Sequence, residues 1–197
     1  MDPPSKTAAG PPILVDAGRF RGRSVRPADA SQEIADWFAD PDRIGPLNLP
    51  PRVLSLPDLR RFFDSFDNRT RILVALIDRK AERLTGFYHA EVQPLHRLSR
   101  ISFLNGPNDL LARRSMAALG RPLLALQFQR LGIEKIVAQV LTTNEVLCQH
   151  LERLGFRREG LLRAQVRGPG GERRDQVLLG LLQGELRPFG TDQNRNV

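Results

Sequence analysis

The second half of the chain alternates between segments typical of strands and segments typical of helices. Ser99–Asn105 is strand-like, and a helix-like stretch follows from Leu110 to Leu131. Lys135–Leu141 is strand-like again, and Asn144–Leu154 has a helical pattern that is closed by Gly155. A strand, helix, strand, helix order places consecutive strands parallel to one another in one sheet. We therefore expect a parallel pair of strands covered by helices.

The first half of the chain contributes antiparallel strands and two helices. Strands are expected at Phe20–Val25, Ile72–Ile77 and Leu84–Val92. The last two are joined by a short charged connection, which favours a hairpin. Ser31 is placed to cap a helix that buries Trp37, and a capping box that begins at Ser55 opens a second helix. Both helices need a sheet to cover, so the two halves are expected to share one.

The ends of the chain are expected to be mobile tails around one domain. Residues 1–12 are rich in proline, and residues 187–197 are polar without periodicity. A terminal hairpin of Leu161–Val166 and Val177–Leu182, around a glycine-rich turn, closes the folded part. With 197 residues and 41% apolar composition, the chain supports one hydrophobic core. We expect a single domain from residue 13 to residue 186.

Composition and patterning exclude several classes of protein. No apolar run approaches the roughly 20 residues that cross a bilayer, and the N-terminus lacks the layout of a signal peptide. A soluble, cytoplasmic protein without a membrane partner is therefore expected. Cys148 is the single cysteine, so it has no internal disulfide partner. The three histidines lack metal-ligand spacing, and no metal site is expected.

The positive charge of the chain points to an anionic partner without choosing one. The net charge is +8 and the isoelectric point is near 11.0. Such a charge attracts polyanions, which include nucleic acid, a ribosomal surface and a phosphorylated cofactor. Nearly all of the basic residues are arginines, a bias that genomic nucleotide composition alone can produce. No basic stripe is flanked by aromatic residues, as binding of single-stranded nucleic acid would require.

Four spaced segments carry a resemblance to a known family. They are Leu131–Ile136, Asn144, Leu151–Gly160 and Arg174–Leu179. With these segments the chain resembles the GNAT superfamily of N-acetyltransferases, in particular the branch of ribosomal-protein N-terminal acetyltransferases of the Rim type. The resemblance runs from about Phe20 to Leu182. It implies an α/β (α+β) GNAT fold, with a mixed sheet of about seven strands, a V-shaped splay between two central strands, and about four flanking helices.

The resemblance also implies a cofactor and a reaction. The cofactor is acetyl-CoA (coenzyme A), whose pantetheine arm lies between the splayed strands like an added strand. The strand that contains Phe103, Leu104 and Asn105 offers an N–H to the thioester carbonyl. The acetyl group passes by direct attack, in a ternary complex, to a primary amine on a protein N-terminus, an amino sugar or a small molecule. Asn144 is expected to contact the cofactor or substrate, while an N-cap role suits it equally, and Arg153 is assigned to the cofactor.

The segment assigned to the pyrophosphate departs from the family pattern. The pattern has glycine and then a small residue where this chain has Arg114 and Met116, because the phosphates approach bare backbone there. In one interpretation, Arg113 and Arg114 replace the lost approach with charge-assisted contacts. In the other, they are solvated helix residues and the cofactor site has decayed. The residues assigned to the phosphates are Arg113, Arg114, Ser115, Met116 and Ala117.

Pro122 lies inside the same helix-like stretch. A proline in a helix interior costs about 3 kcal/mol and removes a hydrogen bond, so a kink is expected. Alternatively, the preceding loop is long and Pro122 occupies the first turn of a shorter helix. That arrangement would move the phosphate site toward Leu119 and Gly120.

The catalytic candidates come from two elements. The tyrosine that some GNAT enzymes use as general acid aligns with Leu151, so that acid is absent. The candidates in its place are His89 and Glu91, on the strand next to the thioester, and Cys148 on the helix that Asn144 opens. Tyr88 precedes His89, and in a regular strand only one of the two faces the splay. Each candidate also has a structural interpretation, Cys148 as a buried core residue above all, and a base is dispensable if the amine loses its proton to solvent.

Two functions of different classes follow from these features. The first is an acetyl-CoA-dependent N-acyltransferase that acts on a small-molecule or protein N-terminal amine, as a monomer or a homodimer. The second is a catalytically degenerate GNAT-fold binding or regulatory protein, suggested by the altered phosphate segment and the missing tyrosine. Association with the ribosome or nucleic acid is a third alternative, which rests on charge alone.

Overall fold

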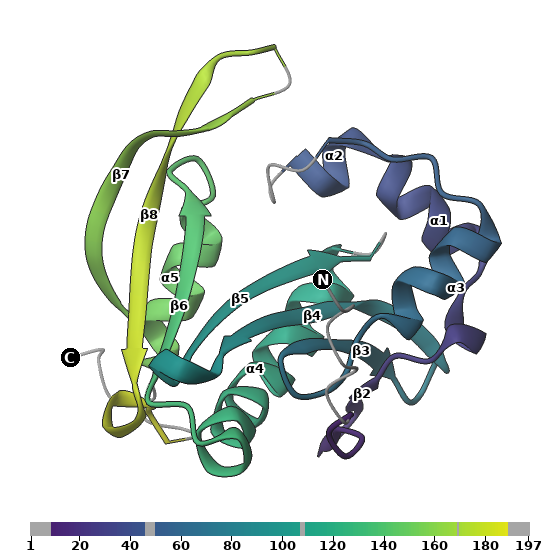
Figure 1. Ribbon diagram of the computed structural model, residues 1–197, viewed down its shortest axis with the longest axis horizontal. Coiled ribbons are helices and arrows are strands. Elements are labelled where there is room, and N and C mark those ends of the chain that lie inside the picture. Colours follow the sequence, from purple (N-terminus) through teal and green to yellow (C-terminus); the bar gives the residue numbers. More distant parts are fainter. Residues whose placement is uncertain (1–8, 46–49, 107–108, 169, 189–197) are drawn as a thin grey trace, which may run out of the picture.

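A computed structural model describes residues 9–45, 50–106, 109–168 and 170–188 of the chain (Figure 1). The strands are β1 (Leu14–Ala17), β2 (Phe20–Ser24), β3 (Arg71–Asp78), β4 (Arg83–Gln93), β5 (Leu98–Asn105), β6 (Lys135–Leu141), β7 (Arg157–Arg167) and β8 (Arg173–Leu182). The α-helices are α1 (Gln32–Ala39), α2 (Pro41–Ile44), α3 (Leu56–Asp64), α4 (Asp109–Leu131) and α5 (Glu145–Leu154). The described residues also form the short 3-10 turns η1 (Pro27–Asp29), η3 (Pro94–His96) and η4 (Gln183–Glu185).

The eight strands form one sheet in the order β1-β2-β3-β4-β5-β6-β8-β7. Neighbouring strands are antiparallel except β5 and β6, which run parallel, so the predicted parallel pair and the mixed sheet are confirmed. The strand that the sequence analysis missed is β1. It forms a hairpin with β2 around a two-residue turn, Gly18 and Arg19, in which Gly18 takes a positive φ of 57°.

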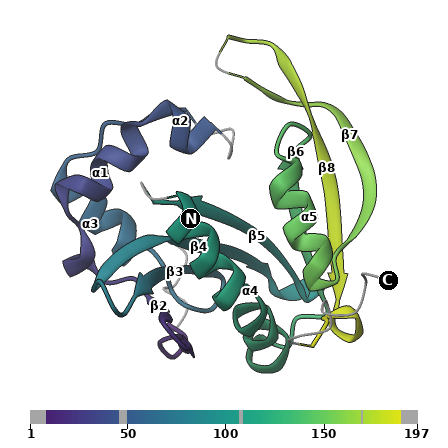
Figure 2. The same cartoon turned by 180° about the vertical axis from the view of Figure 1, so that it is seen from behind.

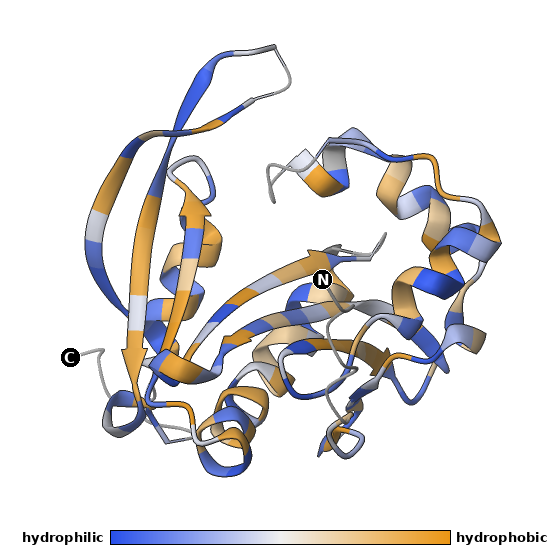
Figure 3. Ribbon diagram, viewed as in Figure 1, coloured by the Kyte–Doolittle hydropathy of each residue, from blue (hydrophilic) through white to orange (hydrophobic). Residues whose placement is uncertain are grey.

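Hydrophobic side chains fill both faces of the sheet. Alternate residues of one strand enter different clusters, since Val74 packs in one and Leu73 in the other. The first cluster lies under α4 and α5, and the second lies under α1, α2 and α3 (Figure 2). Colouring by hydropathy shows long apolar stretches along β6 and β8 and a mixture of polar and apolar residues on the helices (Figure 3). We call the face under α1 to α3 the concave face.

Strands β5 and β6 pair over only part of their length. Their register runs from Leu98 opposite Lys135 to Ile101 opposite Ala138 and then stops. Beyond that point β6 stays paired with β8 as far as Leu141, while β5 stays paired with β4 as far as Asn105. The two strands diverge in Figure 1, and the predicted V-shaped splay is confirmed.

The predicted helix caps are present. The side chains of Ser31 and Ser55 accept hydrogen bonds from the main-chain N–H of Ile34 and Asp58 and open α1 and α3. Gly155 closes α5 in the left-handed conformation. Each cap is formed between residues that are close in sequence, so it can be predicted without knowledge of the tertiary structure.

Helix α4 runs from Asp109 to Leu131 with Pro122 in its interior. The alternative in which Pro122 opens a shorter helix is therefore wrong. The cost of an interior proline is about 3 kcal/mol. Burial offsets this cost, because Leu119, Leu123 and Leu124 around the proline are almost completely buried against the sheet.

The terminal hairpin is longer than predicted and irregular. β7 begins at Arg157, and its register with β8 shifts between Leu162 and Val166, where Ala164 has a φ of 50°. The Asp175 carboxylate holds this bulge by accepting a 2.6 Å hydrogen bond from Ala164 N–H. Both strands thus extend far beyond the rest of the sheet (Figure 1).

Most of the two expected tails, residues 1–8 and 189–197, lies outside the described residues. Gly10 donates a 2.7 Å hydrogen bond to the carbonyl of Asp67, so the packed chain begins before residue 13. No helix in the described part of the chain is long and apolar enough to cross a membrane.

Candidate functional site

The outer edge of β5 offers bare main-chain groups beyond Ile101. Gly106 N–H donates to the carbonyl of Thr85, so Gly106 turns its polar groups toward β4. Successive residues of a strand turn theirs in opposite directions, so Ser102 and Leu104 also point toward β4. Phe103 and Asn105 then point toward β6, where β5 has no partner.

The three residues predicted to hold the thioester therefore differ in what they offer. Phe103 and Asn105 direct N–H and C=O groups into the splay, whereas those of Leu104 belong to the β4 ladder. The side chains of Phe103 and Leu104 are buried on opposite faces, in different clusters. These two side chains hold β5 in the core, while the main-chain groups of Phe103 and Asn105 have no strand partner.

The residues predicted to form the phosphate loop lie inside α4. The helix begins at Asp109, so the main-chain N–H groups from Arg113 to Met116 donate to helical carbonyls. Met116 is buried in the cluster under α4. Arg113, Arg114 and Ala117 are exposed. The predicted segment is therefore no loop, and its main-chain N–H groups are taken up by the hydrogen bonds of the helix.

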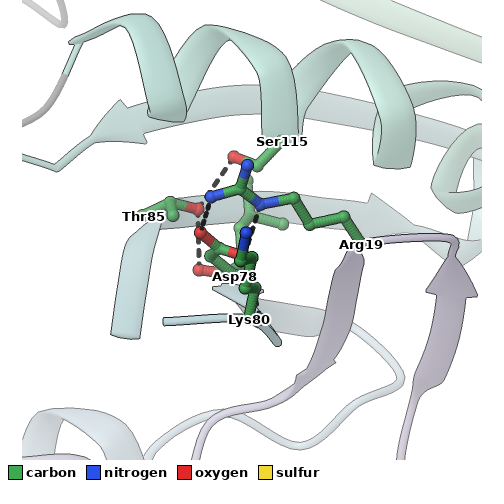
Figure 4. Close-up of polar contacts among 6 residues, drawn as sticks. Arg19, Asp78, Lys80, Thr85 and Ser115 are labelled. Atoms are coloured by element: carbon green, nitrogen blue, oxygen red, sulfur yellow. Dashed lines mark hydrogen bonds and ion pairs between the residues drawn. The ribbon is translucent and has the colours of Figure 1, made fainter. Parts of the chain in front are cut away.

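Ser115 is occupied by structural hydrogen bonds. Its side chain is fully buried, lies 2.8 Å from the hydroxyl of Thr85, and donates to the carbonyl of Ala112 at 2.8 Å. Figure 4 shows this pair beside the ion pair of Arg19 and Asp78. Its assignment to the phosphates is not supported by this placement.

Helix α5 places Asn144 at its N-cap, next to the far end of β6. The Asn144 side-chain oxygen accepts a 3.3 Å hydrogen bond from Leu147 N–H, so the capping interpretation holds. Within the described residues the side-chain amide nitrogen has no hydrogen-bond partner, which leaves its two donors for a ligand. Arg153 is exposed in the last turn of the same helix.

Solved structures resemble the fold of this chain. Spermidine N-acetyltransferase from Vibrio cholerae, in complex with CoA and spermine, matches with a TM-score of 0.75 and 18% identity over 85% of this chain and 97% of its own. A GNAT-family acetyltransferase from Bacillus anthracis matches with a TM-score of 0.73 and 18% identity over 88% and 100%. A ribosomal-protein-S5-alanine acetyltransferase from Vibrio fischeri matches with a TM-score of 0.72 and 15% identity over 89% and 100%.

The chain has the GNAT acetyltransferase fold. No model of a protein family matches the sequence, and no curated protein matches it. The likeness therefore lies in the three-dimensional structure.

On this GNAT fold, Tyr88 and His89 face opposite sides of β4, as predicted. Tyr88 is fully buried under α4, where its hydroxyl accepts a hydrogen bond from the Gln127 amide, and burial raises its pKa. His89 lies on the concave face and is half-buried. Of the two rings, only His89 is partly exposed to solvent.

The His89 ring is held by polar and aromatic neighbours. Nδ1 lies 3.3 Å from the hydroxyl of Ser102, Nε2 lies 4.0 Å from a carboxylate oxygen of Glu91, and the ring of Phe66 packs edge-on at 5.8 Å. Burial lowers the pKa of His89, Glu91 opposes this, and Arg71 adds to it. The imidazole is therefore neutral at pH 7 and able to accept a proton.

Ser102 is a site residue that the sequence analysis missed. It pairs with His89 across the β4–β5 ladder and is the first residue of β5 beyond the last pair with β6. The register of β4 with β5 decides which side chain of β5 stands opposite His89 and meets the imidazole. That register is set by tertiary packing and cannot be counted from the sequence.

Cys148 lies away from the bare edges. Its side chain is fully buried in the cluster under α4 and α5, and burial raises its pKa. The thiol is therefore protonated and shielded, which corrects its assignment as a catalytic group. The core interpretation is the one that its placement supports.

Proposed function

We propose that the chain is an N-acyltransferase that moves an acetyl group from acetyl-CoA to a primary amine. The observation that carries this proposal is the parting of β5 and β6 after Ile101, which leaves main-chain groups of Phe103 and Asn105 bare. A similar structure, the spermidine N-acetyltransferase, was solved with CoA and an amine. That comparison supports an acyl-CoA and an amine as the ligand classes.

The splay fits the arm of coenzyme A. Bare N–H and C=O groups of an unpaired edge hold an extended ligand as they would hold another strand. Bound acetyl-CoA supplies the activated acyl group as a thioester. Phe103 N–H is the donor placed for its carbonyl oxygen, where negative charge develops during attack. Asn144, across the splay, supplies amide donors to the same arm.

The residues that would bind the pyrophosphate of acetyl-CoA differ from those of the family pattern. The exposed side chains of Arg113 and Arg114 follow the first turn of α4, and guanidinium groups pair well with phosphate oxygens. Arg153 on α5 adds a third positive charge on the helices that flank the splay. Side-chain charge thus takes over a role that a glycine-rich loop would give to the main chain.

His89 is the general base in this proposal, with Glu91 beside it. A primary amine is protonated in water at pH 7, so it loses one proton to solvent before attack and a second proton as the carbon–nitrogen bond forms. The neutral imidazole accepts the second proton, and the Glu91 carboxylate, at 4.0 Å, stabilises the imidazolium. Glu91 is half-exposed, so its effect is screened by water.

The acceptor that we favour is a protein N-terminus, as in the Rim-type branch. One structural neighbour is a ribosomal-protein-S5-alanine acetyltransferase. A net charge of +8 disfavours a polycationic acceptor such as the spermine in another neighbour's structure, because like charges repel. A peptide amine carries less charge and suits the basic surface better.

Calorimetric titration with acetyl-CoA, followed by a thiol-release assay, tests the proposal. We expect saturable binding and release of free thiol with peptide amines. Absence of binding at millimolar acetyl-CoA would exclude the function. The altered phosphate segment favours one alternative, in which the chain is a binding or regulatory protein. Binding of acetyl-CoA without release of thiol in the presence of peptides, amino sugars and polyamines would establish this alternative.

A further inference from the structure

His89 and Ser102 form a polar pair at the point where the sheet parts. Ser102 is the first residue of β5 without a β6 partner, and the neighbouring residue Phe103 turns its N–H into the splay. The Ser102 hydroxyl is 3.3 Å from Nδ1 of His89. The imidazole thus reaches the bare edge of β5 through the serine, since β4, which carries it, lies one strand further in.

The other neighbours of His89 prepare it to receive a proton on Nδ1. Glu91, on the same strand, faces Nε2 and favours a proton there, which leaves the Nδ1 lone pair directed at Ser102. Phe66, after α3, fixes the ring plane from the opposite layer. The residues that stand opposite Glu91 on its two neighbouring strands are both positively charged, Arg71 of β3 and Arg100 of β5.

We propose that the Ser102 hydroxyl relays the proton of the attacking amine to Nδ1 of His89. The inference rests on the proposed acyl transfer and names a residue that the general mechanism does not require. The amine attacks in its neutral form, after it has lost its ammonium proton to solvent. As its nitrogen bonds to the acyl carbon, one N–H proton passes to the Ser102 oxygen while the serine proton moves to Nδ1. The carbon–sulfur bond then breaks, the departing thiolate takes a proton from solvent, and His89 returns its proton to solvent.

Removing the hydroxyl with Ser102→Ala tests the relay. We expect kcat to fall by about 100-fold, the low end for a lost acid–base group, with the KM for acetyl-CoA unchanged. Ser102→Thr restores a hydroxyl on a strand position that tolerates β-branching, and should recover most of kcat. Ser99→Ala is the matched control. Its hydroxyl is on the same strand but buried on the other face, without a hydrogen-bond partner among the described residues.

The pH profile separates a relay from a packing role. In the unaltered protein kcat should rise with pH as His89 loses its proton, with a midpoint below the ordinary histidine value. Ser102→Ala and His89→Gln should both flatten this rise. A serine that only supported the fold would lower kcat equally at every pH.

Nuclear magnetic resonance tests the pair without any substrate. The chain has three histidines, so each ring can be assigned and titrated. We expect neutral His89 to carry its proton on Nε2, and Ser102→Ala to shift the His89 titration while the other two histidines stay unchanged. Ser99→Ala should shift none of them.

The outcomes distinguish the relay from the function itself. Full kcat and an unchanged pH profile in Ser102→Ala, with an active parent, would overturn the relay and leave the acyl transfer standing. A resting His89 with its proton on Nδ1 would also overturn it. An unaltered protein that binds acetyl-CoA but releases no thiol with any amine would remove the proposed function and the relay together.

Discussion

Asp78 is a buried carboxylate whose charge is held by one arginine. It accepts hydrogen bonds from Nε and Nη2 of Arg19, at 2.8 and 2.5 Å, and from the N–H of Lys80 at 3.1 Å (Figure 4). Its side chain has no exposed surface. The hydrogen bonds from Arg19 lower the pKa of Asp78 to about 2. The pair ties the β1–β2 turn to the end of β3.

Acid should weaken the folded state through this residue. A pKa lowered by folding stabilises the protein above the unfolded value of about 3.9, and that contribution is lost as the pH falls toward 2. Asp78→Asn should therefore reduce the free energy of unfolding at pH 7, and the difference from the parent should shrink between pH 4 and pH 2. Urea unfolding at several pH values measures this. Asp64→Asn, at an exposed aspartate, serves as control, and a difference that is constant with pH would contradict the argument.

Two of the three catalytic candidates lie where sequence reasoning placed them. His89 and Glu91 share a strand with alternation that a sequence shows directly, so their common face was predictable. Cys148 is the buried core residue that the sequence analysis gave as its structural interpretation, and it lies in the cluster under α4 and α5. Ser102 was missed because only the pairing of β4 with β5 brings it to the imidazole.

At the scale of elements, Asn144 combines a structural and a proposed binding role at the start of α5. Asn144→Ala should cost about 1 kcal/mol of stability, because the cap of the Leu147 N–H is lost. Asn144→Asp keeps a capping oxygen and favours the helix dipole, so stability should hold. It also removes the amide donors, so acetyl-CoA should bind more weakly. Thermal unfolding and calorimetric titration measure the two effects, and unchanged affinity in Asn144→Asp would leave the cap as the residue's whole role.

The first turns of α4 should contribute to cofactor binding through charge. Arg113→Gln combined with Arg114→Gln should weaken acetyl-CoA binding by about 10- to 100-fold, as expected for lost charge-assisted hydrogen bonds. Added salt should weaken the parent more than the double variant. Arg130→Gln, on an exposed arginine in the last turn of the same helix, is the control. Equal affinities in all three proteins would show that these arginines are only solvated.

Elements with short-range signals were predicted well, and those that depend on partners were not. The caps at Ser31 and Ser55 mark helix starts within four residues of sequence. β1 is only four residues long and becomes a strand by pairing with β2, although the Gly18–Arg19 turn is a signal that could have revealed it. α4 continues through Pro122 because burial outweighs a local penalty. α4 begins at Asp109, so the segment from Arg113 to Ala117 that was assigned to the phosphates is helical and not a loop.

At the scale of the whole molecule, η4 near the end of the described residues is docked against the end of α5. Gly155 has a φ of 113°, and a Cβ placed there would lie 2.1 Å from the carbonyl oxygen of Glu185. Gly155→Ala should therefore cost about 2 kcal/mol or more, from backbone strain and from displacement of η4. Gly160→Ala is the control, since a Cβ at Gly160 meets nothing within 4 Å. Chemical unfolding measures both, and a cost below 0.5 kcal/mol for Gly155→Ala would contradict the docking.

The adjacent rings of β4 make the proposed chemistry depend on a single strand offset. Tyr88 sits in the interior under α4, and His89 stands one residue later on the concave face. If β4 slipped by one position between its neighbours, the phenol and the imidazole would change places. A basic ring would then lie in an apolar layer, and the concave face would present a weakly acidic phenol. Insertions or deletions in the loops that flank β4 are therefore compatible with the proposed chemistry only if they keep the register of β4 with β3 and β5.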